Sequence, residues 1–155
     1  KLRLDQPLLI AECLRKDAFP RHDAKLLAAL VAPFVYDGDQ EIKITRKITP
    51  RKLVRGFNRL RRQLTDLLER MQQEEFPVSP MFLWPAWAIY AWARGMDWEA
   101  ITGQIGIADG DFAMLITRTA DNLRQIASLK ESHPETAALA FEAMDTILRE
   151  PVVFE

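Results

Sequence analysis

The stretch DGDFAMLITRTADNLRQI, residues 109–126, carries two rows of side chains at helical spacing. One side of the predicted helix is apolar and comprises Phe112, Leu115, Ile116, Leu123 and Ile126. The opposite side carries Met114, Arg118, Asp121 and Gln125, at spacings of four, three and four that stay aligned over three turns. The first row predicts packing against a core. The second is either an ordinary solvated face, with Arg118 and Asp121 paired across one turn, or a binding surface.

The same spacing runs through the rest of the chain, in which glycine is scarce and proline marks the breaks between segments. We therefore predict an all-α bundle of about six to seven helices, one of them long and basic. A chain of 155 residues is expected to form a single domain, residues 1–155. Within it, residues 1–36 would form lead-in helices and residues 49–155 the bundle.

Proline, glycine and capping residues predict where the helices begin and end. The expected helices are 8–15, 24 to about 33, 50 to about 76, 80–94, 98–104, 109–129, and one that starts at 134 and stops before 151. Asp23, Thr49 and Asp97 are expected N-caps, and Gly95 is the expected glycine after a helix end. The alternation of Ile42, Lys43 and Ile44 predicts a short extended stretch.

Three further apolar patterns predict the core. The long helix should bury Leu53, Phe57, Leu60, Leu64, Leu67 and Met71, and the last helix should bury Ala137, Phe141, Met144 and Leu148. The aromatic run FLWPAWAIYAWARG, residues 82–95, resembles a base-stacking platform in composition, but it holds no basic residue before Arg94. Core packing of Trp84, Trp87, Tyr90 and Trp92 is therefore the favoured interpretation.

The segment RKITPRKLVRGFNRLRR, residues 46–62, contains eight basic residues and no acidic one. Arg51, Arg55, Arg59 and Arg62 project from the side of the long helix opposite Leu53. Positive charge near a helix N-terminus opposes the helix dipole, so a compensating partner is expected. That partner is either a phosphate backbone or the acidic side chains of another protein domain, and a solvated charged face remains an equal alternative.

Motifs for catalysis or nucleotide binding are missing from the chain. It has no GxxxxGK[ST] loop and no GxGxxG element. His22 and His133 lie in predicted loops without ligands at metal spacing, and Asp109 and Asp111 are expected to stabilise a helix N-terminus. We therefore predict no catalytic residue, no metal site and no cofactor in this chain.

The bulk composition gives weaker indications about partners and location. The net charge of −1 supplies no overall attraction to nucleic acid or to a membrane, and no apolar run is long enough to span a bilayer. One cysteine, Cys13, fits a reducing compartment, and we expect the cytoplasm. The chain starts at Lys1 rather than methionine, so we expect it to be a piece of a longer protein.

The order of segments resembles the C-terminal DSHCT domain of DExH-box RNA helicases of the exosome-associated, superkiller type. The resemblance covers the chain from about Leu8 to its end and favours a bacterial member. The matching positions are Trp92, Ala93 and Gly95, then Trp98 and Ile101, then Asp109 and Gly110, then Leu123, Arg124 and Gln125, and finally Ile147, Arg149 and Val152.

The resemblance implies a helical bundle that packs on two RecA-like motor domains and closes a channel for single-stranded RNA, or for DNA. One bundle helix in such helicases is described as a ratchet, and residues 109–129 match it. Arg118 would then contact phosphate or a base, Asp121 would hold Arg118 in place, and Gln125 would offer hydrogen bonds. Met114 stands where family members often carry a basic residue.

The same resemblance implies that the parent protein is an ATP-dependent helicase, a hydrolase whose ATP and magnesium are bound by the motor domains. This chain would contribute no catalytic group. The alternative function is an α-helical interaction module that docks an acidic protein through the face from Arg51 to Arg62. A GxxxxGK[ST] loop and a DExH box upstream of Lys1 would support the helicase, and their absence would leave the interaction module.

Overall fold

The computed structural model describes residues 5–152 and confirms the all-α prediction. Within those residues it has seven α-helices, one short 3-10 helix and no β-strand. The elements are α1 (Gln6–Arg15), α2 (Ala24–Val35), η1 (Arg46–Ile48), α3 (Arg51–Gln73), α4 (Leu83–Ala93), α5 (Trp98–Ile105), α6 (Asp109–Ala127) and α7 (Pro134–Ile147).

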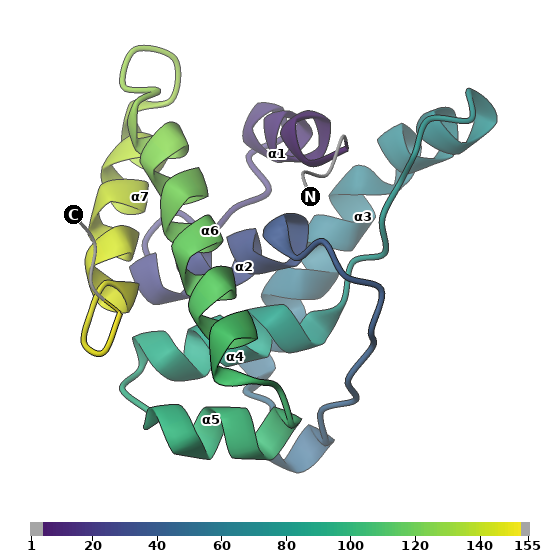
Figure 1. The fold of residues 1–155 in the computed structure, drawn as a ribbon. Helices are drawn as coiled ribbons and strands as arrows, with labels where there is room; N and C mark the ends of the chain where they lie inside the picture. Colours follow the sequence, from purple (N-terminus) through teal and green to yellow (C-terminus); the bar gives the residue numbers. More distant parts are fainter. Residues whose placement is uncertain (1–4, 153–155) are drawn as a thin grey trace.

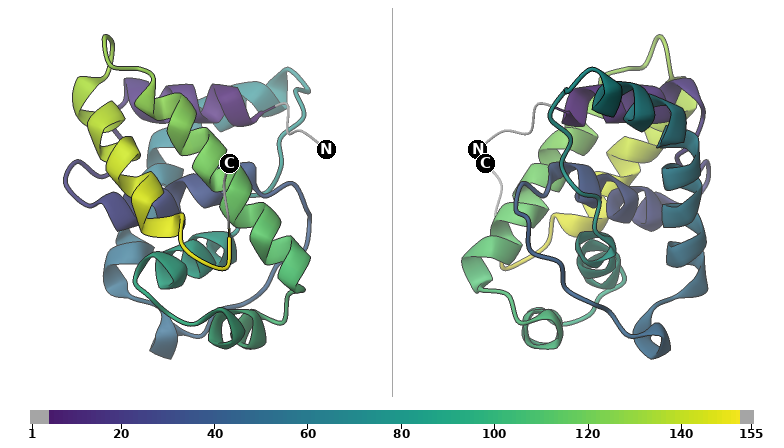
Figure 2. Two further views of the ribbon diagram at one scale, coloured as in Figure 1. Left: turned by 60° about the vertical axis from the view of Figure 1, so that its left-hand side comes forward. Right: turned by 90° about the vertical axis from the view of Figure 1, so that its right-hand side faces the viewer.

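Helix α2 runs through the middle of the molecule (Figure 1). Every residue from Leu26 to Val35 is buried, because after its first turn the helix has no polar side to turn toward water. It contacts α1, α3, α4, α6 and α7, so that five helices pack around one apolar rod. Helices α6 and α7 lie side by side on one flank of α2, and α3 lies on the other (Figures 1 and 2).

The predicted buried rows of the long helix and of the aromatic helix are confirmed. Leu53, Phe57, Leu60, Leu64 and Met71 of α3 are buried, and Leu67 is partly buried against the core. All four aromatic residues named above in α4 are buried. Proline 85 lies in the first turn of α4, and Gly95 follows its end with a positive φ of 99°, as expected for a glycine at that position.

Gly56 has a packing role that helix propensity alone does not reveal. A Cβ atom at this position would lie 2.9 Å from Cδ1 of Leu30, so the missing side chain lets α3 approach α2 closely. Glycine in a helix interior costs about 1 kcal/mol relative to alanine. The close contact with the central helix offsets that cost.

The prediction for the last helix was wrong at Phe141, whose side chain is 67% exposed. Helix α7 instead buries a row of small residues, Ala137, Ala140 and Ala143, together with Leu139 and Ile147. Alanines at a spacing of three residues let α7 approach α6 and α2 closely, and this turns the large ring of Phe141 outward. Met144 and Leu148 are only partly buried.

Two local predictions were also wrong, and the predicted N-cap at Asp97 is confirmed in position only. Pro50, not Thr49, occupies the N-cap position of α3, because the Thr49 hydroxyl donates to the carbonyl of Thr45 at 2.7 Å and closes η1. Helix α2 continues through Pro33 to Val35, since burying Phe34 and Val35 outweighs one lost hydrogen bond near the helix end. Asp97 stands at the N-cap of α5 without a side-chain cap bond.

The predicted extended stretch at Ile42–Ile44 is not a strand. No other strand exists in the described part of the chain to pair with it, so its backbone has no sheet to join. Ile42 and Ile44 are partly buried against the core and anchor the long connection between α2 and η1.

The C-terminal exit of α7 is fastened to the end of α4 by Arg149. Its guanidinium lies over the ring of Trp92, 3.3 Å from the ring centroid. It also donates from Nη2 to the carbonyl oxygens of Trp92, at 3.1 Å, and Met96, at 2.7 Å. A cation at the C-terminal end of α4 adds hydrogen bonds to carbonyls there and complements the negative end of the helix dipole.

The predicted cap at Asp23 is confirmed, and its removal should destabilise α2. Oδ1 accepts from the backbone N–H of Leu26 at 3.0 Å, and Oδ2 forms an ion pair with Lys52 of α3. Asp23→Ala should lower the free energy of unfolding by about 1–2 kcal/mol, measured by urea denaturation. Asp23→Ser, which keeps an N-cap oxygen but loses the Lys52 pair, should lose less than about 1 kcal/mol. Equal losses in the two variants would contradict the capping role.

The pH dependence of this contribution follows from the pKa of Asp23. Burial acts to raise that pKa, but the hydrogen bonds from Lys52 and the Leu26 N–H outweigh burial and hold it below the usual value. The stabilisation is therefore fully present above the unfolded pKa of about 4 and is lost as the pH falls through the lower folded value. The difference between wild type and Asp23→Ala should shrink in acid below about pH 4.

Candidate nucleic-acid interface

Helix α6 is anchored on one side and open on the other. Its predicted apolar row, Phe112, Leu115, Ile116, Leu123 and Ile126, is buried against α2 and α7. On the open side Met114 is 50% exposed, and Asp121 and Gln125 are exposed as well. The helix lies on the outer surface of the molecule in all three ribbon views (Figures 1 and 2). Its open side is therefore available to a partner.

Met114, Arg118, Asp121 and Gln125 together form the open row of α6. Arg118 forms an ion pair with Asp37, which follows the C-cap of α2. Nη1 of Arg118 lies 2.9 Å from Oδ2 of Asp37, and the two side chains are only 30% and 26% exposed. Partial burial acts to raise the pKa of Asp37, but the hydrogen bond and the charge of Arg118 outweigh it and hold the pKa below the usual value. Arg118 is therefore held by a residue that lies 81 positions earlier in the sequence.

The expected pairing of Asp121 with Arg118 is wrong. Asp121 instead accepts a hydrogen bond from Nη1 of Arg124 at 2.8 Å. Both arginines are three residues from Asp121, so local spacing does not choose between them. The choice is made by Asp37, which engages Arg118 from another part of the chain. Asp121 stays on the open side of α6, but it does not position Arg118.

A pocket of about 220 Å³ lies beside the N-terminal half of α6. Its walls come from α6 and from the connection that follows α2, and its lining includes Tyr36, Asp37, Trp84, Asp111, Met114 and Arg118. Two members of the open row, Met114 and Arg118, therefore line this pocket as well as the outer surface. The sequence analysis did not single out Tyr36 or Asp37, although both fall in the APFVYD segment, residues 32–37.

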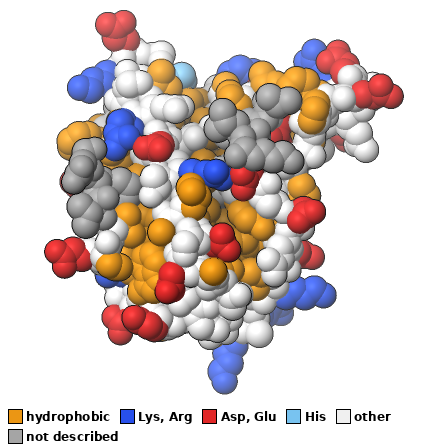
Figure 3. Space-filling model, in the orientation of Figure 1, with side chains coloured by type: hydrophobic (Ala, Val, Ile, Leu, Met, Phe, Trp, Pro, Cys, Tyr) orange, Lys and Arg blue, Asp and Glu red, His pale blue; other side chains and the backbone are white. Residues whose placement is uncertain are grey.

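The face that carries α6 has no single dominant charge. Figure 3 shows acidic and basic side chains scattered over this face, with apolar patches between them. A strand bound here would be held by individual polar contacts and by stacking, with little contribution from a broad basic field.

The four arginines named in the long helix are exposed and lie on the side of α3 opposite the Leu53 row. Arg59 is partly engaged, because its Nη2 donates to the backbone carbonyl of Asp17 at 3.0 Å. Helices α3 and α6 lie on opposite flanks of α2 (Figure 2). Arg51, Arg55, Arg59 and Arg62 therefore form a second surface that is separate from the open row of α6.

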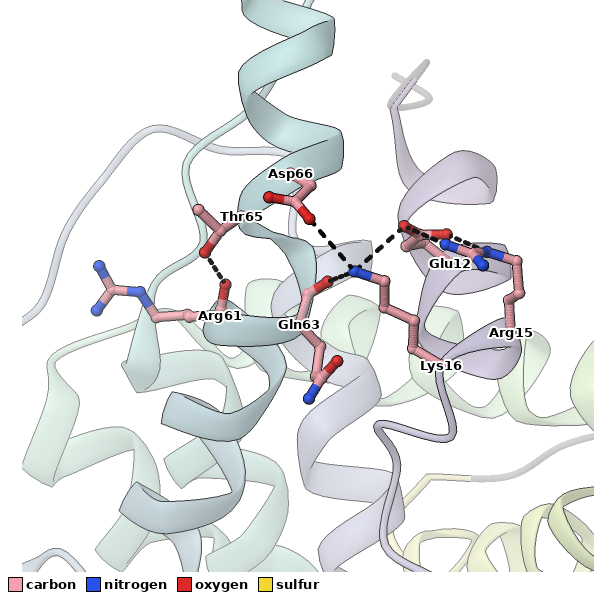
Figure 4. A network of polar contacts seen from close by, with 7 residues as sticks. All are labelled: Glu12, Arg15, Lys16, Arg61, Gln63, Thr65 and Asp66. Atoms are coloured by element: carbon pink, nitrogen blue, oxygen red, sulfur yellow. Dashed lines mark hydrogen bonds and ion pairs between the residues drawn. The ribbon is translucent and has the colours of Figure 1, made fainter.

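The second half of α3 is tied to α1 by a network that the sequence analysis missed (Figure 4). Nζ of Lys16 donates to the carbonyl of Gln63 at 3.0 Å and lies 3.8 Å from Glu12 and 4.0 Å from Asp66. Arg15 in turn bonds to Glu12, and that hydrogen bond lowers the pKa of Glu12. Lys16 and Gln63 lie 47 residues apart in the sequence, so no local pattern signals these contacts.

Among residues 5–152, no three His, Cys, Asp or Glu side chains come together in a way that would hold a metal ion. Burial raises the pKa of Cys13 to about 12, which keeps its thiol protonated and unreactive. Of the helices described, none has the length and apolar character needed to cross a membrane.

Two comparisons show which known proteins the chain is similar to. The model of the DSHCT (NUC185) domain family matches residues 1–155. A segment of 64 residues is 34% identical to the chloroplastic DExH-box ATP-dependent RNA helicase DExH15 of Arabidopsis thaliana. That segment is 41% of this chain and only 6% of the length of the helicase. The similarity is thus to one part of a much longer protein.

Proposed function

The chain belongs to the DSHCT domain family, and on this premise we propose that it is the C-terminal helical-bundle domain of an ATP-dependent DExH-box RNA helicase. In this proposal the bundle packs on two RecA-like motor domains of the same protein. The open side of α6 lines the path of single-stranded RNA and helps to convert motor-domain closure into strand movement. ATP and magnesium would be bound by the motor domains, and the bundle would supply no catalytic group.

The observation that carries the proposal is the two-sided character of α6. One side is packed into the core, whereas Met114, Asp121 and Gln125 face outward along about three turns of the helix. The row from Met114 to Gln125 is about 16 Å long by helical rise, close to the length of about five stacked nucleotides. A rigid helix with polar groups along that length suits contacts with a strand that moves past it.

Three side chains of the open row can contact RNA in this function. Arg118 can donate to a phosphate or lie against a base, and Gln125 can both donate and accept hydrogen bonds. Met114 is flexible and apolar, so it can contact bases of any sequence. These contacts would not require a net positive face, which agrees with the mixed charges around α6.

Replacing Arg118 with alanine tests this proposal in the complete protein. A charge-assisted hydrogen bond contributes about 1.5–3 kcal/mol, so Arg118→Ala should lower the rate of RNA unwinding by about tenfold or more. The ATPase rate measured without RNA should not change, because the motor domains are untouched. Unwinding is measured with a fluorescent duplex that carries a single-stranded overhang.

Lys130→Ala is the matched control, because Lys130 is an exposed cation shortly after the end of α6. It lies five residues beyond Gln125, the last member of the open row. This variant should unwind RNA at nearly the wild-type rate. If Arg118→Ala also unwinds normally, Arg118 is not part of the strand path.

A second candidate function is docking of an acidic protein through the arginine face of α3. Arg51, Arg55 and Arg62 are exposed, and within the described residues no ion pair engages them. This face would attract either phosphates or carboxylates. RNA binding that is insensitive to salt, together with tighter binding of an acidic protein, would favour this second function.

A further inference from the structure

The pocket beside α6 is built from preformed walls. The ring of Tyr36 packs edge-on against Trp84, with centroids 4.7 Å apart, and against Phe82 at 6.1 Å. The Tyr36 hydroxyl accepts from the backbone N–H of Gln40 at 3.3 Å, and Nε1 of Trp84 donates to the Gln40 carbonyl at 2.9 Å. A Cβ atom at Gly38 would collide with the Tyr36 hydroxyl, so the loop fits closely around this ring.

The polar groups at the pocket are mainly acidic. Asp37 and Asp111 both line it, and Arg118, the one cation in the lining among residues 5–152, is already paired with Asp37. The pKa of Tyr36 is influenced by the same acidic groups. Burial raises the pKa of the Tyr36 hydroxyl, the Gln40 N–H opposes that shift, and the charges of Asp39, Asp37 and Asp111 raise the pKa further.

This charge distribution selects among the parts of an RNA strand. A phosphate entering the pocket would meet two carboxylates and only one arginine, and that arginine is already shared. A neutral, flat group with N–H donors meets acceptors and apolar walls instead. The pocket is thus suited to a base, whereas phosphates would remain on the outer side of α6.

We propose that this pocket receives one base of the bound strand and favours adenine or cytosine, which carry an amino group where uracil carries a carbonyl. The proposal rests on the RNA path along α6 described above. The amino group would donate to Asp111, because Asp37 is paired with Arg118, and the ring would lie among Tyr36, Met114 and Arg118. Uracil is disfavoured because it presents a carbonyl oxygen at the position where adenine and cytosine present an amino group, and that oxygen would face the carboxylates.

The test compares homopolymers in the complete protein. Labelled oligo(rC), oligo(rA) and oligo(rU) of about twelve nucleotides are titrated at one salt concentration, and binding is followed by fluorescence anisotropy. We expect the Kd for oligo(rU) to be about tenfold higher than for the other two, since one hydrogen bond to a charged acceptor has about this effect. Equal affinities, or tighter binding of oligo(rU), would overturn the proposal.

Asp111→Asn and Asp111→Ala connect that preference to the pocket. Both remove the negative charge, and both should reduce the ratio of affinities to about threefold or less. Asp145→Asn removes an exposed carboxylate on α7, away from the pocket, and should keep the full ratio. A ratio that persists in both Asp111 variants would place the base preference elsewhere and would overturn the assignment to this pocket.

The outcomes separate this inference from the proposed function on which it rests. If the three oligomers bind equally and Arg118→Ala still weakens binding, the base pocket is wrong and the strand path along α6 stands. If no oligomer binds, or if Arg118→Ala has no effect on any of them, the strand path itself is wrong and the pocket assignment fails with it.

Discussion

Replacing Trp92 with alanine is expected to lower the free energy of unfolding by about 4 kcal/mol or more, the largest loss that we predict. The side chain is only 1% exposed and packs edge-on against Trp98 and Phe112, with centroids 5.5 and 5.8 Å away. Its indole N–H donates to the carbonyl of Ile147 at 2.9 Å. Removing Trp92 therefore opens a cavity where α4, α5, α6 and the end of α7 meet, and the Ile147 carbonyl keeps only its hydrogen bond from the Arg149 backbone N–H.

The measurement is urea denaturation followed by far-ultraviolet circular dichroism, because the chain has four tryptophans and its fluorescence would change with the substitution itself. Phe141→Ala is the control, since it removes another large ring from an exposed position. It should change stability by less than about 0.5 kcal/mol. Trp92→Phe keeps a ring but loses the N–H, and it should fall between the two. Similar losses for Trp92→Ala and Phe141→Ala would contradict the burial of Trp92 against Trp98 and Phe112.

Replacing Arg149 with alanine should lower the free energy of unfolding by about 2–3 kcal/mol. The variant loses charge-assisted hydrogen bonds to the carbonyl of Trp92, where the bond is part-buried, and to that of Met96, where it is exposed. A bond of this kind contributes about 1.5–3 kcal/mol, least where solvent reaches it. It also loses the contact of the guanidinium with the Trp92 ring, which contributes about 0.5–2 kcal/mol. Burial lowers the pKa of Arg149, and Asp97 opposes that shift, so the group stays charged near neutral pH.

Arg149→Lys separates the charge from the shape of the side chain. Lysine keeps the cation but cannot lie flat on the ring and donate to both carbonyls, so about half of the loss should remain. Arg94→Ala is the matched control, because Arg94 is exposed and lies over Tyr90 at a longer distance of 5.2 Å. It should cost less than about 1 kcal/mol. If Arg149→Ala were as mild as Arg94→Ala, the fastening of α7 to α4 would not matter for stability.

The core rows of α3 and α6 were predictable because each helix has one apolar side and one polar side. Leu53, Phe57 and Leu60 recur at intervals of three and four residues, and only one orientation of the helix buries them together. The same argument failed for α7, where apolar residues lie all around the helix. Periodicity therefore does not predict whether Phe141 or the alanines are buried. The alanines are buried because they allow close packing against α6 and α2.

The candidate site was predictable only in outline. The open row of α6 follows from spacing, and three of its four members are exposed in the structure. The partner of Arg118 did not follow from spacing, because Asp37 lies just after the C-terminal end of α2, 81 residues before Arg118. The pocket beside the row also depends on Tyr36 and Trp84, which belong to separate segments and meet only in the folded chain. That these residues contact RNA stays a prediction.

By itself, the sequence determined that the chain is helical, approximately where each helix lies, and which side of each amphipathic helix is apolar. These properties depend on residues within one or two turns of each other, so they can be read locally. Only the tertiary structure decided that α2 forms the centre, that Arg118 pairs with Asp37 rather than Asp121, and that a pocket forms beside α6. Each of these depends on groups far apart in the chain, and their meeting is set by how whole helices pack.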